Sequence, residues 1–132
     1  MQRVVPKDTV IANGGSLSSQ TTGTYGTPGG GIDSAGLMLV GLEMPAAWTA
    51  ADITFQASRD GTTFKNVFNA DGTEFKITAP PADAMIPLAG EIDTLAWRFI
   101  KVRSGISGAT VNQVAERTIT LLFREQRAGR YV

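Results

Sequence analysis

Apolar and polar residues alternate along much of this chain, with the period of two that is typical of β-strands. Residues 52–58, DITFQAS, place Ile53 and Phe55 on one face and Thr54 and Gln56 on the other. The same alternation recurs in several later segments. The residues that this pattern predicts to face a core are Ile53, Phe55, Phe75, Ile77, Ile119, Leu121 and Phe123.

Turn-forming residues divide the chain into short predicted strands. These strands cover residues 8–12, 37–44, 52–58, 63–68, 73–78, 84–88, 97–103 and 117–125. The segment 37–44 is apolar on both faces, as expected of a central strand, whereas Pro87 confines 84–88 to a sheet edge or a strand end. No long segment carries an apolar stripe at helical period. The pattern therefore predicts an all-β protein, a single antiparallel β-sandwich or jelly-roll-like domain.

Two Asp-Gly pairs, Asp60-Gly61 and Asp71-Gly72, interrupt the alternating run. A calcium loop needs oxygen ligands at fixed alternate positions and ends in a bidentate Glu, and neither surrounding sequence supplies that set. Asp-Gly between two alternating runs is a strong hairpin signal, because Gly adopts the positive φ of a tight turn. Both pairs are therefore predicted to be hairpin corners, and no metal ligand is assigned to either.

Residues 14–36 differ from the rest in composition, because they hold eight of the fifteen glycines together with Ser and Thr. Such a stretch buries little apolar surface and loses much backbone entropy on folding. It is predicted to be a long arm or loop that becomes ordered against a neighbour. The expected organisation is one domain over residues 1–132, with the Gly-rich arm at 14–36, a β-sandwich core at 37–123 and a short basic C-terminal tail at 124–132.

Composition excludes several classes of function. The chain has 132 residues, enough for one domain with one core. It contains no Cys and no His, which excludes disulfides, thiolate metal sites and nucleophiles that depend on a histidine base. Twelve basic and twelve acidic residues balance, so no strong field directs the protein to nucleic acid or to a membrane. The sequence shows neither a membrane-spanning apolar run nor a signal peptide, and a soluble protein is expected.

Residues suited to catalysis are sparse. The carboxylates are scattered over strand ends and turns, which is the default for Asp and Glu in a β domain. A glycosidase needs only two of them in one cleft, and the sequence leaves that alternative open. The glycines of GTPGGG, residues 26–31, do not form a phosphate-binding loop, because no Gly-Lys pair and no helix follow. The sequence therefore predicts a protein that is not an enzyme, with no catalytic residue, no cofactor and no metal.

The aromatic residues form two groups. Trp48 and Trp97 lie beside predicted strands and are expected to cap the core. An exposed Trp48 with nearby carboxylates would instead suit the stacking of a sugar ring. Tyr25 and Tyr131 lie in the arm and in the tail, where docking onto a neighbour is easier than reaching the core.

Basic residues are concentrated near the C-terminus. Residues 98–132 carry seven basic and two acidic groups, against five and ten in residues 1–97. Solvated strand faces also use Lys and Arg, and most of this charge is expected to be of that kind. The last residues differ, because Arg and Tyr are types enriched in interface cores. The predicted partner-contact residues are Tyr25, Arg124, Arg127, Arg130 and Tyr131.

Two stretches carry a resemblance to known proteins. MPAAWTAADITFQASRDGTTF, residues 44–64, and KVRSGISGATVNQVAERTITL, residues 101–121, resemble a small β-domain of structural proteins from tailed bacteriophages and related prophages. The resemblance covers residues 37–123. It implies a virion component without catalytic residues, either a capsid decoration or cement protein or the base of a head fibre or spike.

The resemblance also implies partners. A decoration protein binds the major capsid protein or other virion proteins and forms homo-oligomers on the particle, which is assembled in the bacterial host cytoplasm. Neither nucleic acid nor a membrane is expected as a partner. The alternative is a carbohydrate- or receptor-binding module of a phage tail or fibre, with Trp48 and loop carboxylates at its site.

Overall fold

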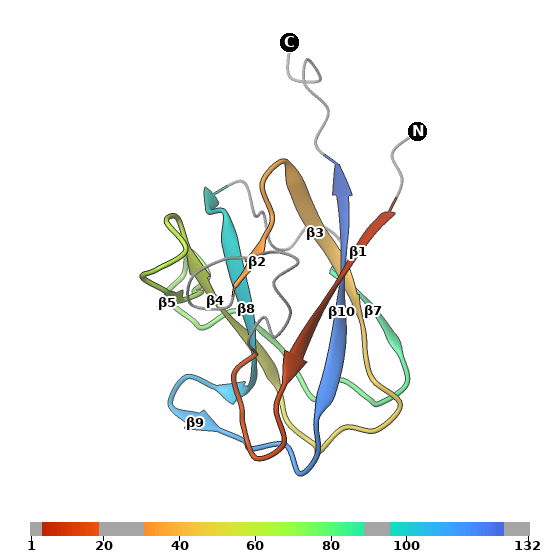
Figure 1. Ribbon diagram of the computed structural model, residues 1–132. Helices are drawn as coiled ribbons and strands as arrows, with labels where there is room; N and C mark the ends of the chain where they lie inside the picture. Colours follow the sequence, from red (N-terminus) through yellow and green to blue (C-terminus); the bar gives the residue numbers. More distant parts are fainter. Residues whose placement is uncertain (1–3, 19–30, 89–95, 126–132) are drawn as a thin grey trace.

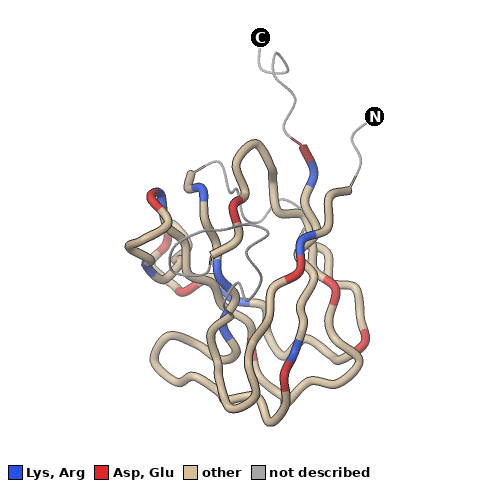
Figure 2. The backbone as a smooth tube through the Cα atoms, viewed as in Figure 1, with Lys and Arg blue, Asp and Glu red and all other residues tan. Residues whose placement is uncertain are grey.

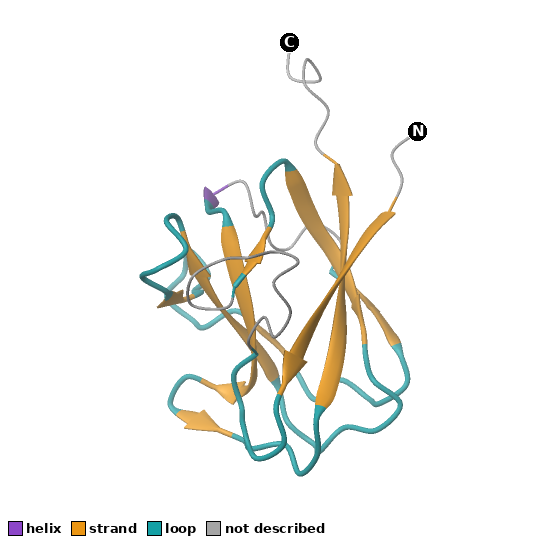
Figure 3. Cartoon of the chain, viewed as in Figure 1, coloured by secondary structure: helices purple, strands orange, loops and turns teal. Residues whose placement is uncertain are grey.

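The computed structural model describes residues 4–18, 31–88 and 96–125, and strands joined by loops make up almost all of this part (Figure 3). Two antiparallel sheets lie on either side of a shared apolar core (Figure 1). The all-β prediction is confirmed, and the arrangement is that of a β-sandwich.

The first sheet holds four strands in the order β1-β10-β3-β7. Their bounds are Val4–Ile11 for β1, Arg117–Glu125 for β10, Leu37–Glu43 for β3 and Met85–Pro87 for β7. β3 lies inside the sheet, as predicted for the segment that is apolar on both faces. β7 lies at the edge, which confirms the prediction made from its proline. β10 ends next to Arg124, where the apolar alternation stops.

The second sheet follows the order β2-β8-β4-β5, with β6 also paired to β4 and β9 to β8. The bounds are Ile32–Asp33 for β2, Phe99–Ile106 for β8, Ile53–Ser58 for β4, Lys65–Asn66 for β5, Lys76–Ile77 for β6 and Ala109–Thr110 for β9. β4 and β8 form the long central pair, in register from Ile53 and Ser104 to Ser58 and Phe99. The shorter strands extend this pair on both sides.

The apolar core lies between the two sheets. Of the predicted core residues, Ile53, Phe55, Phe75, Ile119, Leu121 and Phe123 are buried, and Ile77 is partly buried against them. The ring centroids of Phe55 and Phe75 are 5.8 Å apart with a tilt of 35°, a spacing at which aromatic rings attract. Trp48 and Trp97 are partly buried against the same core, which confirms their predicted packing role.

A β-bulge adjusts β3 to its neighbour β10. Leu122 of β10 faces Gly41 of β3. The next register pair joins Phe123 to Leu39, so Val40 is the extra residue of the bulge. The bulge reverses the alternation within β3, which explains why the segment shows no clean period of two in the sequence.

The first sheet begins earlier than the predicted core of 37–123. β1 pairs with β10 along its whole length, so residues 4–11 belong to the sandwich. Pro6, Lys7 and Asp8 interrupt the apolar pattern of this segment and conceal most of the strand in the sequence. A strand at a sheet edge accepts such a proline, because the missing N–H group leaves no ladder bond unmade.

Both described ends of the Gly-rich stretch 14–36 are part of the fold. The backbone N–H groups of Gly14 and Ser18 each donate to a carbonyl oxygen of the folded domain at 2.7 Å. Ile32 is fully buried in β2. Residues 19–30 lie outside the described part, so the arm remains a prediction there.

Candidate functional site

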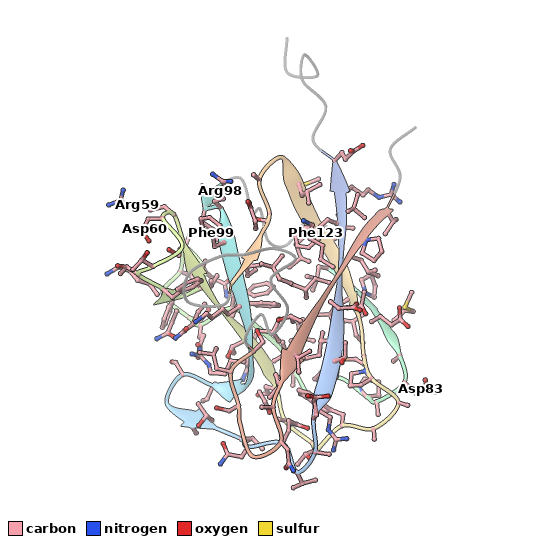
Figure 4. All side chains as sticks on the ribbon, in the orientation of Figure 1. Arg59, Asp60, Asp83, Arg98, Phe99 and Phe123 are labelled. Atoms are coloured by element: carbon pink, nitrogen blue, oxygen red, sulfur yellow. The ribbon has the colours of Figure 1, made fainter. Side chains whose placement is uncertain are left out.

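A pocket of about 360 Å³ opens at one end of the second sheet, where the chain turns from β4 into β5. We call it the β4–β5 pocket. Its lining includes Arg59, Asp60, Lys65, Asn66, Phe68 and Trp97. Figure 4 shows Arg59 and Asp60 at this end of the molecule, far from Asp83 at the opposite end.

The turn between β4 and β5 forms part of the pocket rim. Asp60 Oδ1 accepts hydrogen bonds from the backbone N–H groups of Thr62 and Thr63 at 2.9 Å, and from Ser58 Oγ at 2.8 Å. These bonds, above all that from the Thr63 N–H group, lower the pKa of the Asp60 carboxyl to about 2. Gly61 has a φ of 81°, which glycine adopts freely. This Asp-Gly pair is therefore a hairpin corner, as predicted.

The second Asp-Gly pair makes another corner, closed by a hydrogen bond of 2.8 Å from Asn69 N to Thr73 O. Asp71 Oδ1 accepts from Thr73 Oγ1 at 2.6 Å and from Thr73 N at 2.9 Å, and these bonds lower the pKa of the Asp71 carboxyl. Gly72 has a φ of 93°. Within the described ranges, no three acidic side chains gather as metal ligands. Asp60 and Asp71 each accept hydrogen bonds within their own turn.

Asn66, in the pocket lining, is held by a buried arginine of β8. Arg103 Nη1 donates to Asn66 Oδ1 at 2.9 Å, and Arg103 Nη2 donates to Glu74 Oε2 at 2.7 Å. Since the amide oxygen of Asn66 accepts from a guanidinium, the orientation of the amide is fixed. Its NH₂ group has no acceptor among the described residues and remains a donor.

The other side chains of the pocket are free to meet a ligand. Phe68 exposes 53% of its surface. Arg59 and Lys65 are exposed, and neither forms an ion pair with any residue that the structure describes. Trp97 is partly buried, and its Nε1 has no acceptor in the same part of the chain. The pocket thus combines aromatic surface with cationic and amide donors.

Of the partner-contact residues predicted from the sequence, the structure describes Arg124, which is not in the pocket lining. Arg124 is exposed on β10, in register with Val4 of β1 and Met38 of β3. The other four, Tyr25, Arg127, Arg130 and Tyr131, lie outside the described residues, and their role stays a prediction.

Several basic side chains of the C-terminal part are engaged within the fold. Arg98 forms a bidentate pair with Asp33, at 3.0 Å for Nε to Oδ1 and 2.8 Å for Nη2 to Oδ2, which lowers the pKa of the Asp33 carboxyl. Arg103 is only 5% exposed. Lys101 Nζ lies 4.4 Å from the centroid of the Phe64 ring, and burial lowers its pKa. Figure 2 shows basic and acidic residues interspersed over the fold, so this part of the protein is not one solvated cationic face.

Sequence reasoning missed the pocket, and its alternative aromatic platform was Trp48. Trp48 is not in the pocket lining, and its Nε1 donates to Ala51 O at 3.3 Å. The signal that could have revealed the site is Phe68. It directly follows the buried Val67, so a strand alternation places its ring on the solvent side.

No protein-family model, no curated protein and no solved structure matches the chain. Among the described residues, no helix is long and apolar enough to cross a membrane. The role of the protein must therefore follow from its own fold and side chains.

Proposed function

We propose that the protein is a non-enzymatic structural component of a tailed-phage virion, which decorates or cements the capsid surface through protein–protein contacts. The observation that carries this proposal is the order in which the strands pair. It adds to the resemblance of residues 44–64 and 101–121 to phage structural proteins.

The principal strands pair in a nested order. β1 pairs with β10, β2 with β8, β3 with β7 and β4 with β5, so each pair lies inside the one before it. An antiparallel ribbon that is folded back on itself pairs in this way, and rolling that ribbon into two sheets gives a jelly roll. Jelly rolls occur in viral capsid domains and in lectins. We therefore propose the jelly-roll class for this sandwich.

The beginning of β1 and the end of β10 offer one place for attachment to a particle. Val4 is in register with Arg124, and the two strand ends lie side by side (Figure 1). We propose that the Gly-rich arm and the basic tail extend from the domain as straps onto neighbouring subunits. Their contacts would come from Tyr25, Arg124, Arg127, Arg130 and Tyr131. The partners would be the major capsid protein and further copies of this chain, without nucleic acid or membrane.

The use of the described carboxylates supports a non-enzymatic role. Asp33 and Glu74 bind arginines, and Asp60 and Asp71 hold their own turns. A glycosidase needs two carboxylates across one cleft. Among the described residues, the β4–β5 pocket is lined by one acidic side chain, that of Asp60, whose Oδ1 already accepts three hydrogen bonds.

Purified particles of the phage or prophage that encodes the chain test this proposal. Quantitative mass spectrometry should find the protein at a fixed ratio to the major capsid protein. Particles from a deletion strain should lack a surface density in cryo-electron microscopy and should break open at a lower temperature. Particles that contain the capsid protein but none of this chain would contradict the proposal.

The β4–β5 pocket favours a second candidate, a carbohydrate- or receptor-binding module of a phage tail or fibre. Lectin domains also use jelly rolls. The mixture of aromatic and polar groups in the pocket is typical of small-ligand sites. Localisation on the particle separates the two candidates, because a decoration protein lies on the head and a receptor-binding module lies on the tail or fibre.

A further inference from the structure

We propose that the β4–β5 pocket binds an acidic saccharide, with the sugar carboxylate at Arg59 and Lys65 and the apolar face of the ring against Phe68. This inference rests on the second candidate function and makes it specific. It does not depend on capsid decoration, so each can fail while the other stands.

The size of the pocket suits this ligand. Its volume of about 360 Å³ lies near the lower end of ligand pockets, which span roughly 300 to 1,000 Å³. A pocket of this size suits a short saccharide.

The aromatic surface suits the face of a sugar ring. Phe68 is 53% exposed although the preceding Val67 is buried, which leaves most of a large apolar side chain in water. A pyranose ring has an apolar C–H face and a polar rim of hydroxyl groups. Placing that face on Phe68 removes apolar surface from water, while the hydroxyl groups remain free for hydrogen bonds. Trp97 supplies a second aromatic surface in the same lining.

The charged groups select an acid over a neutral sugar. Arg59 and Lys65 form no ion pair with the described residues. Their two positive charges outnumber the one negative charge of Asp60, which attracts Arg59 through space and accepts hydrogen bonds within its own turn. A guanidinium binds a carboxylate through two parallel hydrogen bonds, and a lysine adds a second positive charge. The NH₂ group of Asn66, oriented by Arg103, can donate to a hydroxyl or ring oxygen. Donors therefore predominate among the described side chains of this pocket.

A saccharide fits the site better than an acidic peptide. Peptides that bind at a sheet edge add a strand and need a row of free backbone groups. β5 spans only Lys65–Asn66, too short to template such a strand. The recognition groups around the pocket are side chains, as in sites for small polar ligands.

Calorimetric titration of the full chain tests the inference. The probes are short oligosaccharides of polyuronate, polysialate and hyaluronan, each beside its carboxyl-reduced form. One acidic probe should bind with a Kd below about 1 mM, and its reduced form should bind at least about tenfold more weakly. Phe68→Ala, Lys65→Gln and Arg59→Gln should each weaken binding by about tenfold or more. Met85→Ala and Lys76→Gln, exposed positions outside the pocket, should leave it unchanged.

The proposal is wrong if no acidic probe binds, if the reduced form binds equally well, or if binding survives the three pocket substitutions. A Glu-rich hexapeptide that binds where the saccharides do not, and is lost in Phe68→Ala, would assign the pocket to a peptide and overturn the saccharide. Each variant is first shown to melt like the original chain, and the three independent substitutions keep the test decisive if one of them unfolds. None of these outcomes bears on incorporation into particles, which is measured separately.

Discussion

Arg103 and Glu74 form an ion pair of 2.7 Å within the fold, with only 6% and 12% of their side chains exposed. The same guanidinium donates to Thr54 of β4 and Asn66 of β5. Ser107, after β8, donates to the other oxygen of Glu74 from both its N–H and its hydroxyl group. One arginine of β8 therefore holds together two further strands and the loop that precedes β6.

Breaking the ion pair between Arg103 and Glu74 should lower the stability of the fold strongly. Arg103→Met leaves the Glu74 carboxylate buried without its partner, and we expect the free energy of unfolding to fall by about 3–5 kcal/mol in urea titrations. The matched control is Arg98→Met, which breaks the more exposed pair with Asp33 and should lower the free energy of unfolding far less. Equal losses for the two variants would show that burial of the first pair has no energetic consequence.

Gly41 of β3 lies close to the backbone of β7. A Cβ atom at this position would lie 2.9 Å from the backbone oxygen of Ile86, and backbone cannot move aside as a side chain can. Gly41→Ala should therefore destabilise the protein by about 1–3 kcal/mol. Gly108→Ala, where a Cβ would meet nothing within 4 Å, should be neutral within about 0.5 kcal/mol. A neutral Gly41→Ala variant would contradict the close approach.

Truncation of the two phenylalanines Phe55 and Phe68 should lower stability to very different extents. Phe55 is fully buried against Phe75, so Phe55→Ala should lower the free energy of unfolding by about 3–5 kcal/mol through the cavity it leaves. Phe68→Ala removes a half-exposed ring and should cost about 1 kcal/mol or less. Chemical denaturation of both variants measures the difference, and a large loss for Phe68→Ala would give that ring a structural role.

The Asp60 carboxyl should make stability depend on acid. Its pKa is lowered to about 2 in the folded protein, against about 3.9 in an unfolded chain. The ionised form therefore stabilises the fold above about pH 4, and this contribution is lost as the pH falls towards about 2. Asp60→Asn keeps an oxygen acceptor in the turn but cannot ionise. Urea midpoints measured across this range should fall less steeply for the variant, and parallel curves would contradict the assignment.

The C-terminal tail is predicted to serve assembly rather than folding. Deletion of residues 126–132 removes Arg127, Arg130 and Tyr131 but no described strand. The melting temperature of the isolated protein should stay nearly unchanged, while occupancy on particles should fall. The charged part of this contact should weaken further at high salt, because ionic attraction is screened. Unchanged occupancy at low and high salt would show that the tail is not a strap.

The strands could be predicted from the sequence because alternation reports which face of a strand is buried. It does not report which strands are neighbours, so the pairing of β1 with β10 was not foreseen. Alternation also does not report which partners a charged residue such as Arg103 will have. In the sequence it is one of several basic residues, but its partners Glu74, Asn66 and Thr54 lie 29, 37 and 49 positions away. The pocket was missed for the same reason, because Phe68 and Trp97 meet only in the folded chain.

Because β10 lies between β1 and β3, these two strands lack a neighbour until β10 has been synthesised. Thr120 Oγ1 donates to Asp8 Oδ1 at 2.6 Å, across 112 positions of the sequence. While the ribosome is still making β10, β1 has no partner in its sheet, and one edge of β3 is open. Contacts of such long range make folding slow, and open strand edges invite pairing with other chains. We expect the nascent protein to depend on protection from aggregation until β10 has left the ribosome.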